Sequence, residues 1–332
     1  MSRTRRLILL LGPLPILAVS VWLSNWMTRQ QSFPPAANTV FGLPRFTAVA
    51  QGEENPTRRS ESAAPRRQTD DGLADVCQDS ARRLKNILGE DAPVVVRPPF
   101  VIAGDLDRAQ LEDWYDRTIH PAAAALANSY FKASPTQPIT VLLFPGETSY
   151  NDNAKKLFGD HGISVYGYYK PQNRTLVMNI GTGGGTLVHE LTHALVDFDF
   201  PDVPDWFNEG LASLHEQCRF REGEAGAWVE GLVNWRLTGL QQAIRAKRVR
   251  PLKTMIEADD FRGELEGANY AQARYLCLYL QRRGLLATFY GRFRAAHPID
   301  PQGVKTLEEV LEIQSWSTLD RDFQQWVLTL KR

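Results

Sequence analysis

The feature that most constrains this chain is an HExxH pattern at residues 189–193, followed sixteen residues later by Glu209. Residues four apart lie on one face of a helix, one turn from each other, so His189 and His193 can aim ring nitrogens at a single point. Glu190 lies beside His189 and can reach a water held at that point. Two histidines and one glutamate, with a fourth position left to water, form the ligand arrangement of a catalytic zinc site. The pattern therefore predicts His189, His193 and Glu209 as zinc ligands.

The surrounding residues predict the two helices that would carry these ligands. Apolar side chains recur at helical spacing through the pattern: Leu187, Leu191, Ala194, Leu195 and Phe198. The two histidines and Glu190 lie off this stripe, grouped on another face. Pro201 and Pro204 then break the chain, and Asp205 is a suitable N-cap for a second helix whose first turns contain Glu209. The alternative is that both histidines are ordinary residues of a helix surface.

Asp197 and His215 are weaker candidates for the third ligand. Asp197 continues the i, i+4 series, but its Cα would lie about 12 Å along the helix axis from that of His189, too far to converge on one ion. His215 would suit a longer three-histidine pattern, but that pattern requires Gly three residues after the second His. This chain has Val196 there. Glu209 is therefore the preferred third ligand.

The sequence HELTH followed by WFNEGLA resembles the gluzincin metallopeptidases, the group that includes thermolysin and the zinc aminopeptidases. It resembles most their small bacterial peptidase MA-like members. The resemblance implies an α+β fold, in which a zincin-like domain with a small mixed sheet and the HExxH helix precedes an all-helical C-terminal half. It also implies that Glu190 is the general base. The gap between the second His and Glu209 is a few residues shorter than in thermolysin, which still allows an antiparallel helix pair.

The same resemblance places a substrate-binding strand beside the HExxH helix. Residues 165–180 have the pattern of a hairpin. We expect residues 175–180, including Val177 and Asn179, at the edge of the cleft, where an extended peptide adds through main-chain hydrogen bonds. Zinc aminopeptidases carry Gly-x-Met-Glu-Asn on this strand, and its Glu holds the free amine of the substrate. Residues 177–179 are Val-Met-Asn and lack that Glu, which favours an endopeptidase.

A hydrolytic site also needs a hydrogen-bond donor for the oxyanion. The resemblance points to a tyrosine in the helix that follows the ligand Glu. Tyr270 fits this place, with Tyr275 as a rival. The alternative for either residue is a core aromatic.

Together these residues predict zinc-dependent hydrolysis of a peptide or protein substrate, with the zinc-bound water activated by Glu190. Two other classes stay open. One is a catalytically inactive gluzincin-like domain that binds peptides or envelope partners, and an intact Glu190 argues against it. The other is a structural protein in which zinc joins two helices, but structural zinc usually has four protein ligands. The net charge is zero, so no basic excess argues for nucleic acid.

The N-terminal part of the chain predicts export. Residues 1–6 carry three arginines, and residues 7–23 contain no charge. This pattern indicates a signal peptide or an uncleaved anchor, and the length of the run favours the anchor. Its positive end would face the cytoplasm. We therefore expect a membrane-anchored protein with an extracytoplasmic catalytic domain, secreted if the segment is cleaved. Residues 1–26 would be the anchor or signal, 27–70 a disordered linker, and 71–332 the metallopeptidase domain.

The three cysteines, Cys77, Cys218 and Cys277, are not spaced for a zinc finger. In an exported protein two of them can form a disulfide. Cys77 with Cys218 is the expected pair. Cys277 lies among leucines and is expected to be a buried thiol.

Overall fold

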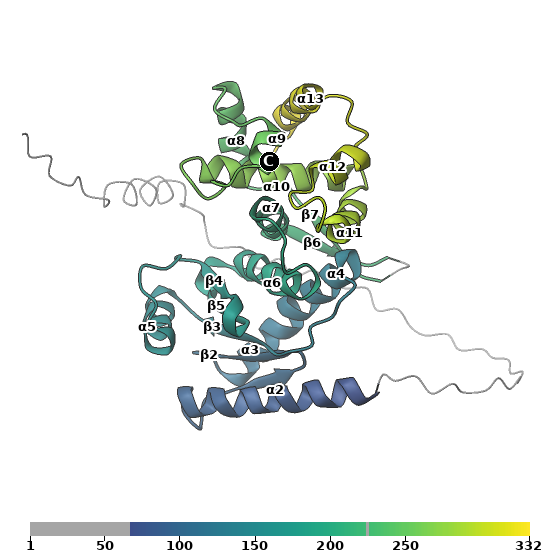
Figure 1. Cartoon of the computed structure of the whole chain (residues 1–332). Coiled ribbons are helices and arrows are strands. Elements are labelled where there is room, and N and C mark those ends of the chain that lie inside the picture. Colours follow the sequence, from purple (N-terminus) through teal and green to yellow (C-terminus); the bar gives the residue numbers. More distant parts are fainter. Residues whose placement is uncertain (1–66, 224–225) are drawn as a thin grey trace, which may run out of the picture. The chain divides into compact units, whose positions relative to one another are not determined.

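The computed structural model describes residues 67–223 and 226–332 (Figure 1). They form a mixed α/β structure, with a small mixed sheet in the first half and helices through most of the second. This confirms the predicted small mixed sheet and helical C-terminal half. Helix α2 (Arg67–Leu88) begins inside the predicted linker, whose other residues lie outside the described part of the chain together with residues 1–26.

We correct the prediction of a transmembrane helix and of a membrane-anchored localisation. Within residues 67–223 and 226–332, every helix is too short or too polar to traverse a lipid bilayer. The uncharged run at residues 7–23, which motivated the prediction, lies outside the described residues.

The main sheet has five strands in the order β1-β2-β3-β5-β4. They are β1 (Val95–Arg97), β2 (Phe100–Gly104), β3 (Ile139–Phe144), β4 (Gly167–Lys170) and β5 (Thr175–Asn179). Strands β2, β3 and β5 run parallel, whereas β1 and β4 pair antiparallel at the two edges. The inner strands have nearly continuous apolar sequences, such as ITVLLF in β3, because both of their faces are buried.

Helices cover both faces of this sheet (Figure 1). One face packs against α2 and α5 (Glu147–Phe158), and the other packs against α4 (His120–Tyr130) and α6 (Gly184–Asp199). Alternate residues of a strand point to opposite faces, so the sheet contributes side chains to two separate cores. Three helical segments follow one another before β3: α3 (Arg108–Trp114), the π-helical turn η1 (Tyr115–Ile119) and α4.

The helix with the HExxH pattern, α6, follows the short 3-10 turn η3 (Ile180–Thr182) and packs against α7 (Asp205–His215). A Cβ atom at Gly185 would lie 2.3 Å from the carbonyl oxygen of Glu216, so only glycine allows the start of α6 to approach the end of α7 this closely. The N-cap of α7 is Pro204 and Asp205 is its first helical residue, so the helix begins one residue earlier than predicted.

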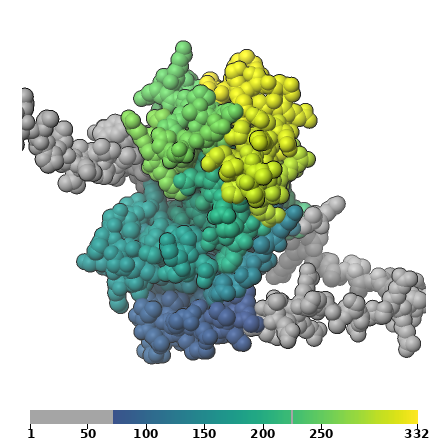
Figure 2. Space-filling model, viewed as in Figure 1, coloured from purple at the N-terminus to yellow at the C-terminus, as the bar shows by residue number. Residues whose placement is uncertain are grey.

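The second half of the chain surrounds α7 with helices. A two-stranded hairpin comes first, formed by β6 (Cys218–Arg221) and β7 (Trp228–Gly231). Then follow α8 (Arg236–Arg245), α9 (Leu252–Ile256), α10 (Glu266–Arg282), α11 (Leu286–Ala296), α12 (Val304–Val310) and α13 (Trp316–Thr329). Helix α7 lies between α6 and α10 (Figure 1). In the space-filling view the residues coloured purple to teal and those coloured green to yellow pack directly against each other (Figure 2).

The buried carboxylate of Asp199 fixes the end of α6. It accepts hydrogen bonds from the backbone N–H groups of Lys132 and Ala133, at 2.8 and 2.7 Å. It also accepts one from the Tyr290 hydroxyl at 2.9 Å and forms an ion pair with Arg294. These partners follow α4 or belong to α11, so the HExxH helix is held by both halves of the chain.

Candidate metal centre

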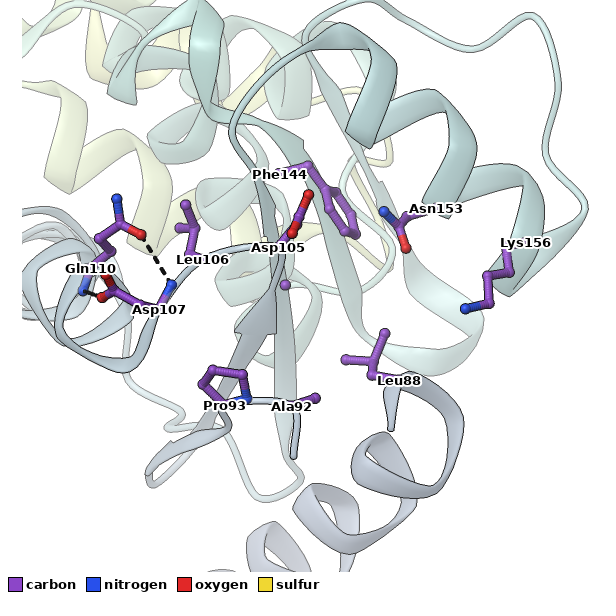
Figure 3. A pocket seen from close by; sticks show the side chains of 11 residues that line it. Leu88, Ala92, Pro93, Asp105, Leu106, Asp107, Gln110, Phe144, Asn153 and Lys156 are labelled. Carbon is purple, nitrogen blue, oxygen red and sulfur yellow. Dashed lines mark hydrogen bonds between the residues drawn. The ribbon is translucent and has the colours of Figure 1, made fainter. Parts of the chain in front are cut away.

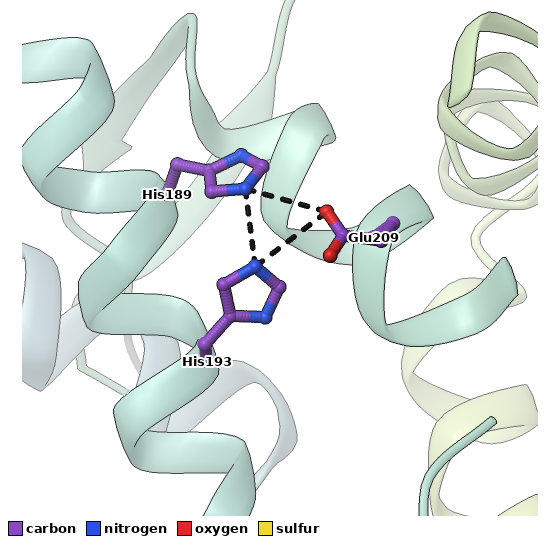
Figure 4. Close-up of side chains that lie close together, drawn as sticks. All are labelled: His189, His193 and Glu209. Atoms are coloured by element: carbon purple, nitrogen blue, oxygen red, sulfur yellow. Dashed lines mark hydrogen bonds and ion pairs between the residues drawn. The ribbon is translucent and has the colours of Figure 1, made fainter. Parts of the chain in front are cut away.

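Two packed helices bring the three predicted ligands together (Figure 4). Helix α6 supplies His189 and His193, whose Nε2 atoms lie 3.1 Å apart. Helix α7 supplies Glu209, whose Oε2 lies 3.4 Å from Nε2 of His189 and 3.6 Å from Nε2 of His193. Each residue therefore turns one ligand atom toward the same small space.

These separations fit a single metal ion. Tetrahedral zinc with bonds of about 2.0–2.1 Å keeps its ligand atoms roughly 3.3 Å apart. The three observed separations are 3.1, 3.4 and 3.6 Å. Two imidazoles and a carboxylate suit zinc, and the same donors also bind other first-row metals. The geometry thus fits a metal site of a class to which zinc belongs.

The partner of each Nδ1 atom determines which ring nitrogen of that histidine is free to bind a metal. Nδ1 of His193 lies 2.8 Å from Oδ1 of Asn208. Because an amide oxygen only accepts, Nδ1 carries the proton and Nε2 keeps its lone pair. Nδ1 of His189 lies 3.3 Å from Oε1 of Glu216, within ion-pair distance although out of line for a hydrogen bond. With both Nδ1 atoms protonated, the two facing Nε2 lone pairs repel unless a proton or a metal ion lies between them.

The histidines and carboxylates of the cluster shift one another's pKa values strongly. Burial lowers the pKa of His189, but the carboxylates of Glu209 and Glu216 outweigh it and raise that pKa to about 10. Burial raises the pKa of Glu209, but the two histidines outweigh it and hold that pKa far below its usual range. In the metal-free chain a proton on the imidazoles therefore balances the buried Glu209 carboxylate.

Glu216 is kept ionised by residues that follow it in the chain. Nη2 of Arg236 donates to Oε1 of Glu216 at 2.7 Å, and Nδ2 of Asn234 donates to Oε2 at 3.2 Å. Burial raises the pKa of Glu216, but Arg236 and His189 outweigh it and lower that pKa to about 2. Carboxylate partners of this kind orient metal-binding histidines and raise their basicity.

The predicted base, Glu190, is half-buried on α6, directly after His189. Its carboxylate is close enough to contribute to the raised pKa of His189. It is not one of the three residues whose atoms converge, which leaves it beside the site.

The two candidate tyrosines lie in different surroundings. The Tyr270 hydroxyl accepts a hydrogen bond from Nη1 of Arg262 at 2.9 Å, and Nη2 of Arg262 donates to Oε1 of Glu209 at 2.7 Å. Tyr270 therefore lies on the Glu209 side of the centre. Tyr275 is fully buried, and its hydroxyl bonds the backbone N–H and C=O of Asn234 at 3.2 and 3.3 Å. Tyr275 is thus the core aromatic.

Neither rejected ligand belongs to the cluster. The Tyr169 hydroxyl donates to Asp197 at 3.1 Å. His215 is buried with Nε2 3.3 Å from the Tyr130 hydroxyl. Its burial, together with nearby positive charge, lowers its pKa to about 3. Both residues therefore have partners outside the cluster, in agreement with the preference for Glu209.

The predicted substrate-binding strand needs correction. Strand β5 pairs with β3 on one side and β4 on the other, so residues 175–180 do not form the sheet edge. The edge strand beside β5 is β4, and β1 forms the opposite edge. Val177 is buried in the core against α2 and α5. The Asn179 side chain is held by the Val165 carbonyl at 2.8 Å and the Gly181 N–H at 3.2 Å. Neither side chain is available to a substrate.

The expected disulfide is also wrong, because all three cysteines are free. Cys77 is buried on the face of the sheet covered by α2, whereas Cys218 packs against the core on the other face. The sheet separates the two sulfur atoms. Cys277 is buried in α10, as predicted, and burial raises the pKa of its thiol.

A separate pocket of about 500 Å³ lies at the carboxyl ends of β2 and β3 (Figure 3). Its polar lining includes Asp105, Asn153 and Lys156. The Asp105 carboxylate accepts a hydrogen bond from the Ser149 hydroxyl at 2.8 Å. No predicted site residue lines this pocket, so its position is unrelated to the convergence of the two histidines and Glu209.

Comparison of the sequence with protein-family models gives no match, and comparison with curated proteins gives none either. The functional assignment therefore depends on the chemistry and geometry of the site.

Proposed function

We propose that this protein is a zinc-dependent peptide-bond hydrolase of the gluzincin kind, built on a zincin-like domain. His189, His193 and Glu209 would hold the zinc ion. The observation that carries the proposal is the triangle of ligand atoms with sides of 3.1, 3.4 and 3.6 Å. Its dimensions suit one ion, and its three protein ligands leave the open position that catalytic zinc requires.

A bound zinc ion lowers the pKa of a coordinated water and polarises a carbonyl group. The chain's own residues would do the rest. Asn208 and Glu216 hold the imidazoles with Nε2 turned inward. Glu190 takes a proton from the attacking water and returns it to the nitrogen of the leaving amine. The Tyr270 hydroxyl donates a hydrogen bond to the oxygen of the attacked carbonyl.

An edge strand of the sheet supports a peptide or protein as the substrate. Of the two edge strands in the described part of the chain, β4 is the one next to β5, and it packs against α6, which carries both histidines. The bond from Tyr169 on β4 to Asp197 on α6 ties the two elements together. An extended peptide can add to such an edge through main-chain hydrogen bonds. This placement suits a peptide or protein substrate better than a small molecule.

The test is Glu190→Gln in the full chain, with zinc content and hydrolysis of an unstructured protein such as casein as the two readouts. Loss of a general base costs about 10²–10⁴-fold in rate. We expect zinc content to be unchanged, because Glu190 is not a ligand, and hydrolysis to fall by that factor. Hydrolysis at the unchanged rate would contradict the role of Glu190. A wild-type chain that binds zinc and cleaves nothing would indicate a peptide-binding domain instead.

A further inference from the structure

Arg262 lies in the segment between α9 and α10 and contacts a predicted ligand directly. Its Nη2 donates to Oε1 of Glu209 at 2.7 Å. The other oxygen of the same carboxylate, Oε2, faces the Nε2 atoms of His189 and His193. The Glu209 carboxylate is therefore divided, with one oxygen turned to the ligand triangle and the other bound by a guanidinium.

The same guanidinium is fixed by two more residues. Nε and Nη2 of Arg262 donate to the two oxygens of Asp205, at 3.2 and 3.3 Å. Nη1 donates to the Tyr270 hydroxyl at 2.9 Å. Asp205 and Glu209 lie one turn apart on α7, whereas Tyr270 lies on α10. Because the guanidinium is planar and its donors are fixed relative to one another, three partners on two helices define its orientation.

This arrangement limits how Glu209 can bind an ion. A carboxylate can ligate a metal through one oxygen or through both. A hydrogen bond between a guanidinium and a carboxylate is charge-assisted and stronger than a neutral one. The Glu209 side chain is only 5% exposed, so little water reaches its carboxylate, whereas the Arg262 side chain is 50% exposed. The bond to Arg262 holds Oε1 away from the ligand triangle and leaves Oε2 facing it, which favours ligation through one oxygen.

We infer that Arg262 is a positioning residue that restricts Glu209 to one-oxygen ligation and places Tyr270 beside that ligand. This inference rests on the proposed metal site. Arg236 does not share the role, because its partner Glu216 lies behind His189 on the other side of the centre.

The test uses the full chain and cobalt(II) alone as the probe, with affinity and visible absorption as readouts. Partners of metal ligands typically contribute about 10–100-fold to metal affinity. We expect Arg262→Ala to weaken cobalt binding by that factor. We also expect weaker visible absorption, because releasing Oε1 lets Glu209 ligate through both oxygens and raises the coordination number.

A matched control is Arg250→Ala. Arg250 makes a two-bond ion pair with Asp260, at 2.6 and 2.7 Å, which anchors the same segment without touching Glu209. We expect this variant to bind cobalt as the wild type does. If Arg262 only anchors the segment, the two variants will behave alike, which would overturn the inference. Arg262→Lys keeps the charge but offers one point of contact, so it should lie between Arg262→Ala and wild type. It also replaces Arg262→Ala if that variant does not fold.

Two failures are distinguishable. A wild-type chain that does not bind cobalt would overturn the metal site, and with it both the proposed function and this inference. A wild-type chain that binds cobalt, with an Arg262→Ala variant of equal affinity and equal absorption, would overturn the inference alone.

Discussion

The two sides of the metal centre are built from different parts of the chain. The histidine side takes its supporting groups from nearby, since Asn208 and Glu216 belong to α7 or follow it directly. The glutamate side depends on Arg262, which is 53 residues beyond Glu209. The residues that contact the imidazoles directly therefore lie within the motif segment, whereas the carboxylate orientation requires the helical half to be folded around α7.

For the residues that support the two sides, the largest expected effect is on the glutamate side. Removing one oxyanion donor typically costs about 10²–10³-fold in kcat. We expect Tyr270→Phe to lower kcat by that factor and to leave zinc content unchanged. The matched variant is Tyr275→Phe, which removes buried hydrogen bonds to Asn234. It should lower the free energy of unfolding by about 1 kcal/mol and leave kcat unchanged. Equal kcat values for the two variants would remove Tyr270 from the mechanism.

An intermediate effect tests the histidine side. Asn208→Ala removes the acceptor that fixes the His193 ring. We expect zinc affinity to fall by about 10–100-fold, as for other partners of metal-binding histidines. Calorimetric titration of zinc into the full chain measures this change. An unaltered dissociation constant would show that the packing of α6 against α7 orients the ring without Asn208.

The smallest expected effect is the pH dependence of stability. The raised pKa of His189 means that its charged form stabilises the metal-free fold fully below pH 6.5, and this contribution is lost as the pH rises through about 10. The lowered pKa of Glu209 means that its charged form contributes above pH 4.5, and this is lost as the pH falls through its folded-state value. For this pair, the metal-free chain is most stable between pH 4.5 and 6.5.

Zinc requires neutral imidazoles, so metal binding competes with the proton on His189. The rise in Tm caused by zinc should therefore be larger at about pH 9 than at about pH 6. Thermal unfolding with and without zinc at both values measures this difference. A Tm increment that does not change with pH would mean that no proton leaves the site when zinc binds.

The local sequence pattern predicts the two histidine ligands because residues four apart lie on the same face of a helix. The spacing of His189 and His193, and the prolines before α7, describe short-range geometry that the fold preserves. The same reasoning could have identified Glu216, because it follows Glu209 by two helical turns and so lies on the same helix face. Arg262 was not, because no periodicity links it to α7, and only the packing of α10 against α7 brings its segment there.

The errors have similar causes. Which strand of a hairpin lies inside a sheet depends on its pairing with a third strand. The sequence did contain a signal, because TLVMN in β5 is more apolar than GYYK in β4, as suits a strand buried on both faces. The predicted disulfide failed because the sheet lies between Cys77 and Cys218.

The most direct test of the metal site is a zinc titration of the wild-type chain beside Glu209→Ala, with stoichiometry and affinity as readouts. We expect one ion per wild-type chain, because one set of three ligand atoms converges in the described residues. We expect a large loss of affinity in Glu209→Ala, because two imidazoles alone do not complete the site. Equal zinc binding by both chains, or none by the wild type, would contradict the proposed metal site.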